Sequence, residues 1–372
     1  MRALLWFKKD LRLDDHPALQ AGLSAEYLLP VYVLEPRQLQ ANAFGMRRMG
    51  VHRARFLLES LAALDGELRQ RGSQLLVLEG EPEQLIPQLV SSLGLQQVLT
   101  LEEIAPDEQA QVARVADRLG EVPLLQAPAN NLLRREELPC DLAQLPTVFS
   151  RFRERVEERL QVFQPRHAPE HLPPLPDGAQ ALMQPIPSLS RLGLGEPLSV
   201  PASAFPFAGG EPAALARLRD YLWKSQGVRQ YKDTRNGLIG TEYSSKFSPW
   251  LANGSLSARR IVADLRRHAA VRQPERQPQE AQHAAQREHR HQPHGDHQLA
   301  MTGQVRYSSS DASFAIIADF ELPHQLLQLA SIHLHLLRTA LQHIGHPPWV
   351  HASGVVGAEV KADVRHAWHR RI

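Results

Sequence analysis

The run YLLPVYVL (Tyr27–Leu34) carries the strongest structural signal in the chain. It is almost wholly apolar, holds β-branched and aromatic residues, and is too short for an ordinary helix. A shorter run of the same kind, ALLWF at residues 3–7, precedes it, and LRLDDH follows that run as a turn rich in helix-capping groups. We therefore expect two buried strands near the start of the chain.

After this run, predicted helices and predicted strands alternate along the chain. Apolar residues at helical spacing predict a helix that ends near Gly72, and they are Phe56, Leu57, Leu61, Leu64 and Leu68. Further strands are expected at 75–78, 97–101 and 122–126, and further helices at 83–93 and 108–119. This alternation predicts an α/β domain over residues 1–163, with a doubly wound parallel five-stranded sheet. No G-x-G-x-x-G follows the first strand, so the ordinary dinucleotide fingerprint is absent.

Composition indicates a soluble globular protein with room for two domains. The chain has 372 residues, of which 43% are hydrophobic and 22% charged, and it has no long apolar run that predicts a membrane span. Its net charge is +2, so any DNA contact requires a local basic face. The start lacks a secretory pattern and Cys140 has no second cysteine to pair with, so we expect a reducing, cytoplasmic location.

The sequence predicts that the sheet domain is followed by a linker and then by a helical domain. A charged amphipathic helix at 149–160, with solvated i,i+4 pairs, closes the first domain. Eleven of the 28 prolines fall between residues 165 and 212, which predicts an extended linker over 164–212. Helical spacing resumes at Leu215, and residues 213–267 are expected to form part of an all-helical domain. Within it, Trp223 is expected in the core rather than as a redox group.

Residues 231–260 (YKDTRNGLIGTEYSSKFSPWLANGSLSARR) combine groups that suit a phosphorylated ligand. The cations are Arg235, Lys246, Arg259 and Arg260, the hydroxyls belong to Ser244, Ser245 and Ser248, and the flat apolar faces belong to Tyr231, Tyr243, Phe247 and Trp250. Hydroxyls, backbone amides and a lysine at the opening of a helix favour an anion. Neighbouring aromatic rings favour a ligand with two phosphates and a flat ring system. The alternative is a solvated turn before an ordinary amphipathic helix, and the chemistry alone leaves both open.

Three segments resemble one family. TRNGLIGTEYSSKFSPWLANGSLSARR (residues 234–260), LLWFKKDLRLDDHPAL (residues 4–19) and FGMRRMGVHRARFLLESL (residues 44–61) are similar to the photolyase/cryptochrome family, in the form typical of DASH cryptochromes. The resemblance covers about residues 1–267. It implies an FAD-binding helical domain in which the matching positions are Tyr231, Ser244, Ser245, Lys246, Phe247 and Ser248. Arg235 is a further cation for this site, although an ion pair with Asp233 or Glu242 is an equal alternative.

The resemblance also implies an activity and partners. Members use light to excite reduced FAD, which repairs cyclobutane pyrimidine dimers by electron transfer, and DASH members prefer single-stranded DNA. We therefore expect damaged DNA as a partner, a monomer, and no membrane. The first domain of the family can hold a folate antenna, methenyltetrahydrofolate, and Asp107 and Glu108 occupy the positions used, beside Glu102 and Glu103. The alternative, which we favour from the letters alone, is that Asp107 caps the next helix.

The chain departs from the family after residue 267. Fourteen of the 18 histidines lie at or beyond His268, and residues 268–372 become rich in His, Arg and Gln, which predicts a largely disordered tail. The family continues here with helices that complete the flavin cavity and carry its electron-transfer tryptophans, so the catalytic residues are unknown. We hypothesise a shifted reading frame, and the other two frames of the coding DNA should then encode the missing helices.

Other features of the tail carry little function. His289, His291, His294 and His297 do not share one helix face, so we expect no metal site. Residues 322–344 are apolar enough for a helix, and Trp349 and Trp368 match no family position. Two alternatives to an active enzyme follow from this departure. One is a non-catalytic, light-sensing or pigment-binding remnant of a truncated or frame-shifted protein, and the other is a remnant without function.

Overall fold

A computed structural model describes residues 1–159, 164–197, 205–237 and 240–271. The predictions for the candidate histidine cluster, the helix at 322–344 and the two tail tryptophans lie outside the described residues. Within the described residues, no helix is long and apolar enough to cross a bilayer. The same residues contain no cluster of three or more His, Cys, Asp or Glu side chains that could hold a metal ion.

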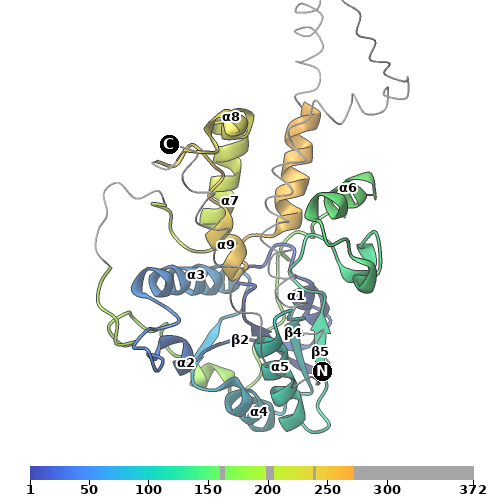
Figure 1. The fold of residues 1–372 in the computed structure, drawn as a ribbon. Helices are drawn as coiled ribbons and strands as arrows, with labels where there is room; N and C mark the ends of the chain where they lie inside the picture. Colours follow the sequence, from blue (N-terminus) through green and yellow to red (C-terminus); the bar gives the residue numbers. More distant parts are fainter. Residues whose placement is uncertain (160–163, 198–204, 238–239, 272–372) are drawn as a thin grey trace, which may run out of the picture.

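The first part of the chain forms the predicted five-stranded parallel sheet (Figure 1). The strands are β1 (Arg2–Phe7), β2 (Tyr27–Leu34), β3 (Leu76–Glu79), β4 (Gln97–Leu101) and β5 (Leu124–Ala127). Their order is β3-β2-β1-β4-β5, and all four neighbouring pairs are parallel. The order reverses between β1 and β4, which is where such sheets bind ligands at the carboxyl ends of their strands.

Helices cover both faces of the sheet, as a doubly wound fold requires. Helices α1 (Pro17–Gly22) and α3 (Val51–Gln70) pack on one face, and α4 (Pro82–Leu93) and α5 (Pro106–Arg118) on the other. A short helix, α2 (Pro36–Leu39), follows β2. The predicted turn over residues 11–16 precedes α1, which was not itself predicted. Its N-cap is His16, whose Nδ1 accepts a hydrogen bond from the Leu19 amide at 3.1 Å.

The proline-rich segment is extended, but it contributes more to the core than its composition suggests. Leu172, Leu189 and Leu194 are buried in the core on the α1/α3 face. Ala179, at the start of the 3₁₀ turn η3 (Ala179–Leu182), is buried on the opposite face. Prolines fix the backbone of an extended chain, so isolated leucines between them can reach the sheet without a regular period.

The segment between β5 and the linker forms three short helical elements. Two 3₁₀ turns, η1 (Arg135–Glu137) and η2 (Leu142–Gln144), precede α6 (Phe149–Arg159). Phe152 and Val156 are the buried side of α6. An i,i+4 pair joins Arg153 and Glu157 at 3.7 Å, but Arg153 Nε and Glu157 Oε1 are buried, so this pair does not lie on the solvated face that the sequence predicted.

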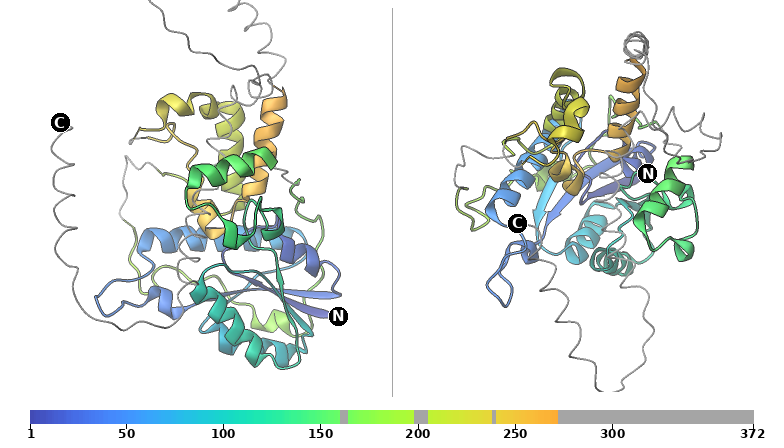
Figure 2. Two further views of the ribbon diagram at one scale, coloured as in Figure 1. Left: turned by 45° about the vertical axis from the view of Figure 1, so that its right-hand side comes forward. Right: turned by 45° about the horizontal axis from the view of Figure 1, so that its top comes forward.

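The later helices stand together beside α3 and away from α4 and α5 (Figures 1 and 2). They are α7 (Glu211–Arg219), the π-helical turn η4 (Asp220–Lys224), α8 (Gly227–Thr234), α9 (Ser248–Asn253) and a helix described over residues 258–271. Their apolar residues form a third core around Trp250, which is fully buried. Trp223 packs against this core, with its ring centroid 4.8 Å from that of His268, in the packing position predicted for it.

Candidate functional site

A cavity of about 1010 Å³ opens at the carboxyl edge of the sheet. Residues after β1, β2 and β4 line it, together with the start of α3, the linker at residues 205–207, and α9. The cavity therefore lies between the sheet domain and the later helices, at the switch point that the strand order defines. Its volume is that of a site for an organic ligand.

One side of the cavity is acidic. Glu103, Asp107 and Glu108, here called the acidic end, follow β4 and begin α5. Lys8 Nζ lies 3.3 Å from Glu103 Oε1, and Lys9 pairs with Glu108. Burial lowers the pKa of Lys8 and raises the pKa of Glu103, and each charge partly offsets the shift of the other. For Glu108, burial raises the pKa, but the Lys9 hydrogen bond and charge outweigh it and lower the pKa.

Asp107 does not cap α5, which corrects the interpretation we favoured from the sequence. The N-cap of α5 is Ala105 and no side chain caps it, while Asp107 lies inside the first turn beyond Pro106. Asp107 is exposed and lines the cavity. The proline at the first helical position moved the cap upstream, because proline is favoured there and needs no hydrogen-bond acceptor. Asp107 is thus available to a ligand, whereas Glu108, which also lines the cavity, is already paired with Lys9.

Aromatic side chains of the linker form another wall. Phe205 and Phe207 line the cavity with Phe56 of α3, and the Phe205 and Phe207 ring centroids are 5.2 Å apart. Behind them lies Trp250, whose Nε1 donates to the Ala208 carbonyl at 3.1 Å. Trp250 is fully buried and belongs to the core, so the expectation that it offers a flat face to a ligand is wrong.

The serine–lysine loop, residues 240–248, leads into the N-terminal end of α9. It does not itself line the cavity, although Pro249, Ala252 and Asn253 of α9 do. The two groups of predicted ligand contacts are therefore separate: Asp107 and Glu108 in the cavity, and the loop residues at the N-terminal end of α9.

Arg217 of α7 is buried beneath the serine–lysine loop and donates hydrogen bonds to the backbone of that loop. Its guanidinium donates to the Ser245 carbonyl at 3.2 Å, to the Thr241 carbonyl at 2.9 Å and to the Ser244 carbonyl at 3.2 Å. The Arg217 side chain is only 3% exposed, and Asp220 Oδ2 neutralises it at 2.7 Å. Because the carbonyls turn inward to a buried cation, the loop has a defined shape without a bound ligand.

The three serine hydroxyls of the loop are unused. Ser244 and Ser245 are half-buried and Ser248 is exposed, and their hydroxyls make no hydrogen bond to any residue in the described ranges. Lys246 has a positive φ of 62° and its Nζ lies 3.3 Å from the Tyr243 ring centroid. Unpaired hydroxyls beside an ammonium group suit the oxygens of a diphosphate.

Three further expectations about this region need correction or refinement. Arg259 pairs with Glu137 at 2.6 Å and Arg260 with Asp14, so these two cations are committed within the protein. Phe247 is 3% exposed and packs edge-on against Tyr221, so only its backbone is available to a ligand.

Arg235 and Tyr231 remain next to the loop at the end of α8. Tyr231 is half-buried, and Arg235 is exposed at the C-cap. Within the described part of the chain Arg235 makes no ion pair, so neither Asp233 nor Glu242 takes it, contrary to the alternative kept open above. Burial raises the pKa of Tyr231, although the charge of Arg235 partly opposes the shift.

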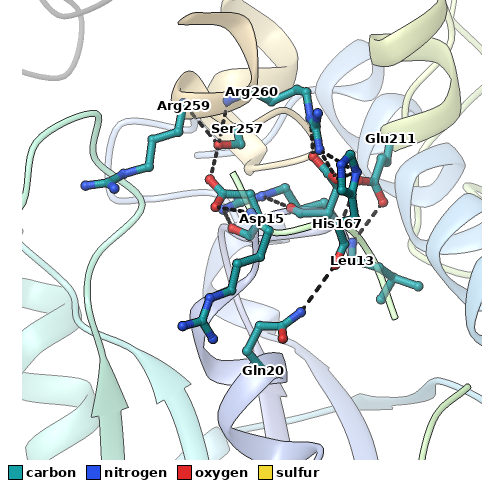
Figure 3. A network of polar contacts seen from close by, with 11 residues as sticks. Leu13, Asp15, Gln20, His167, Glu211, Ser257, Arg259 and Arg260 are labelled. Atoms are coloured by element: carbon teal, nitrogen blue, oxygen red, sulfur yellow. Dashed lines mark hydrogen bonds and ion pairs between the residues drawn. The ribbon is translucent and has the colours of Figure 1, made fainter. Parts of the chain in front are cut away.

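A polar network joins the turn after β1 to the later helices (Figure 3). Glu211, the first residue of α7, accepts from the Leu13 amide at 2.8 Å and the Asp14 amide at 3.0 Å. Ser257 Oγ donates to Asp15 Oδ2 at 2.5 Å. The same turn begins with Lys8 and Lys9 in the cavity, so the network fixes the later helices relative to the cavity.

Comparisons with known proteins agree with this architecture. The family described as DNA photolyase matches residues 3–176. A cryptochrome DASH of Gloeobacter violaceus is 39% identical over 277 residues, which is 72% of this chain and 54% of that protein. The crystal structure of a Synechocystis cryptochrome superposes with a TM-score of 0.67 at 33% identity, over 72% of this chain and 55% of that one.

Over the part that these relatives match, the chain belongs to the photolyase/cryptochrome family. Its relatives there are of the DASH type. An archaeal photolyase from Sulfolobus tokodaii, described with two FAD molecules, shares the fold at a TM-score of 0.52 and 21% identity, covering 71% of this chain and 54% of that one. The chain spans about half the length of the curated relatives it matches.

Several site residues were missed by the sequence analysis. Lys8 and Lys9 follow the first strand directly, and the rule that ligands sit at the carboxyl ends of parallel strands could have identified them. Arg217 and Glu211 had no signal, because a charged residue on an amphipathic helix normally faces solvent. Their partners lie in distant segments of the chain, which a local pattern cannot reveal.

Proposed function

We propose that this protein is a light-absorbing flavoprotein of the DASH type, with FAD at the serine–lysine loop. The observation that carries the proposal is the set of unbonded serine hydroxyls on a loop whose carbonyls are held inward by Arg217. A diphosphate needs several donors and a nearby cation, and this loop offers the serine hydroxyls and Lys246. Arg235 and Tyr231 lie at the adjacent end of α8 and complete the proposed contact set.

Bound reduced FAD would supply the photochemical electron that splits a cyclobutane pyrimidine dimer. The protein's own part is to bind and orient: Ser244, Ser245 and Ser248 donate to the diphosphate, and Lys246 offsets its charge. The proposed substrate is damaged DNA, preferentially single-stranded, because an unpaired lesion costs less to extrude into a pocket. A monomeric state and a cytoplasmic location stay predictions.

We further propose that the cavity holds a folate antenna, methenyltetrahydrofolate, at its acidic end. A pterin carries an amino group and ring N–H donors, and ionised carboxylates accept from these in short, charge-assisted hydrogen bonds. Asp107 and Glu108 supply such acceptors at the cavity wall, and Phe205 and Phe207 supply flat apolar surface for a ring. The cavity volume of about 1010 Å³ is ample for this ligand.

Absorption spectroscopy of the purified full chain tests the flavin site. Bound FAD gives an absorption band in the blue. The band should be lost in a Ser244→Ala/Ser248→Ala variant and kept in a Ser190→Ala control, since the Ser190 hydroxyl bonds only that of Ser188 in the exposed linker. Colourless protein that does not take up added FAD would overturn the flavin proposal. Repair is tested separately, by blue-light reversal of a thymine dimer in single-stranded and duplex oligonucleotides.

One observation favours a second function: this chain matches only about half the length of each of these relatives. A large cofactor is usually enclosed on most of its surface, so half of an enclosing domain holds it weakly. In this alternative the chain is a pigment-binding or light-sensing remnant without repair. It predicts pigment absorption together with no reversal of thymine dimers under blue light in either oligonucleotide.

A further inference from the structure

The ammonium group of Lys246 lies on the face of an aromatic ring in its own loop. Its Nζ is 3.3 Å from the centroid of the Tyr243 ring, a separation that is sterically possible only above the ring plane. Among the residues that the structure describes, Lys246 makes no ion pair. The ring face attracts a cation through its negative quadrupole. It covers one side of the ammonium group and leaves the N–H donors on the other side open to a ligand.

The Tyr243 side chain is itself held in place by the end of α8. A Cβ at Gly237 would lie 2.8 Å from Tyr243 Cβ and 3.1 Å from its Cγ, so glycine leaves the room that this side chain occupies. Thr234, the last residue of α8, donates from Oγ1 to the Tyr243 carbonyl at 3.3 Å. The half-buried tyrosine therefore offers Lys246 a fixed ring face.

The backbone of Lys246 adopts an unfavourable conformation. Its φ of +62° lies in the left-handed region, which residues with a Cβ rarely adopt. Its two neighbours are fixed, because the Ser245 carbonyl accepts from Arg217 at 3.2 Å and the Phe247 side chain is buried. A strained residue persists where its surroundings determine its conformation, and such residues cluster at ligand sites. Both the backbone and the ammonium group of Lys246 are thus fixed before any ligand binds.

We propose that Tyr243 is a positioning residue that holds the Lys246 ammonium group ready for the diphosphate of the ligand. This inference rests on the proposed flavin site and adds a residue that acts on the ligand only through Lys246. A lysine that is free to rotate loses conformational freedom when it binds a phosphate, and this loss lowers the affinity. The Tyr243 ring confines the lysine beforehand, so less freedom is lost when the diphosphate binds.

A double-mutant cycle separates this role from simple packing. Calorimetric titration with FAD gives the dissociation constants of the full-length wild type, Tyr243→Leu, Lys246→Gln and the double variant. Tyr243→Leu should weaken FAD binding about fourfold, the size of an exposed cation–π contact. In the Lys246→Gln background the same change should have no further effect, because no ammonium group remains to be positioned. Tyr243→Phe keeps the ring face and should bind FAD like the wild type.

Tyr27→Leu is the matched control for the loss of a cation–π contact. The guanidinium of Arg2 lies over the Tyr27 ring, with its Cζ 5.2 Å from the ring centroid. Tyr27 is the first residue of β2, at the amino edge of the sheet, and the serine–lysine loop lies beside the later helices. Tyr27→Leu should therefore leave the affinity for FAD unchanged.

Lysine labelling tests the Tyr243–Lys246 contact without any ligand. The Lys246 amine should react with an acetylating reagent about threefold faster in Tyr243→Leu than in the wild type, because the ring no longer covers it. Lys224 is exposed in η4 and is the internal control, which should react at the same rate in both proteins. Within the wild type, Lys246 should react more slowly than Lys224. Mass spectrometry of one digest reads both lysines.

Four results would overturn the inference. If Tyr243→Leu weakens FAD binding equally in both backgrounds, Tyr243 only shapes the loop. Unchanged or tighter FAD binding in Tyr243→Leu would leave the flavin site intact and remove the positioning role. A wild type that does not bind FAD would overturn the flavin site and the inference together. Equal labelling of Lys246 and Lys224 in the wild type would disprove the contact, and this result needs no variant to fold.

Discussion

Arg260 binds Asp14 through two hydrogen bonds, from Nε to Oδ2 at 2.7 Å and from Nη2 to Oδ1 at 2.5 Å, across 246 residues of sequence. Asp14 lies in the turn after β1, and Arg260 lies in the helix described over residues 258–271. Both side chains are largely buried, with 13% and 10% exposed. This pair ties the last described helix to the first turn of the sheet domain.

Removing Arg260 should therefore destabilise the whole fold and not only the helix that carries it. Arg260→Met leaves Asp14 as a nearly buried charge without its main partner, and we expect a loss of about 3 kcal/mol in the free energy of unfolding. Urea unfolding followed by tryptophan fluorescence measures it. Arg267→Met, on the exposed side of the same helix, should change stability by less than about 0.5 kcal/mol. Equal effects of the two variants would contradict the role of the pair.

Gly254 marks a close backbone approach between α9 and the turn after β1. Its φ is +73°, and a Cβ at this position would lie 2.0 Å from the Lys9 carbonyl oxygen. Gly254→Ala should lower the free energy of unfolding by about 3 kcal/mol. Alanine is strained in a left-handed conformation, and its Cβ would overlap with the backbone of Lys9. Gly66→Ala, inside α3 with no atom within 4 Å, should instead stabilise by about 1 kcal/mol. The thermal unfolding midpoints of both variants measure these changes. An unchanged midpoint in Gly254→Ala would contradict a tight backbone contact between Gly254 and Lys9.

Glu211 should make stability fall as the pH rises. Burial raises its pKa to about 6 from the ordinary 4.5, although the amides of Leu13 and Asp14 partly oppose the shift. The folded state therefore binds more protons than the unfolded state between these values. The stabilisation from the protonated form is complete below pH 4.5 and is lost as the pH passes through 6, a loss of about 2 kcal/mol.

Unfolding midpoints measured from pH 4.5 to 7.5 in the wild type and in Glu211→Gln isolate this contribution. Groups with lowered pKa values, such as Asp10 and Glu108, make stability rise with pH instead. They do so in both proteins, so their contribution cancels in the difference between wild type and variant. The wild type should lose stability relative to the variant across this window. Parallel pH profiles would show that Glu211 does not titrate there.

Arg217→Met should release the serine–lysine loop. The loop carbonyls of Thr241, Ser244 and Ser245 lose their common donor, so amides of residues 240–247 should exchange hydrogen at least tenfold faster. Hydrogen exchange read by mass spectrometry follows this segment without any bound pigment. Arg219→Met, on the exposed side of α7, is the control, and unchanged exchange in Arg217→Met would mean that other contacts shape the loop.

Much of the sheet domain was predictable because its signals are local. The strands over residues 27–34 and 97–101 were predicted with the bounds that the structure shows, since short apolar runs between helices have few other solutions. The helix α1 was missed because His16, which is not a usual capping residue, caps it through Nδ1. The cap of α5 was misplaced because a proline shifted it upstream of Asp107.

Local sequence patterns were enough to predict the five strands and the helices α3, α4 and α5 in their order along the chain, and they drew attention to Asp107, Glu108 and the serine–lysine loop. Which charges are free to meet a ligand became visible only in the folded chain. Arg259 and Arg260 have partners far away in the chain, whereas Arg48 and Arg53 have none among the described residues. The reason is physical: helix and strand periods depend on neighbouring residues, while an ion pair depends on which distant segments the packed core brings together.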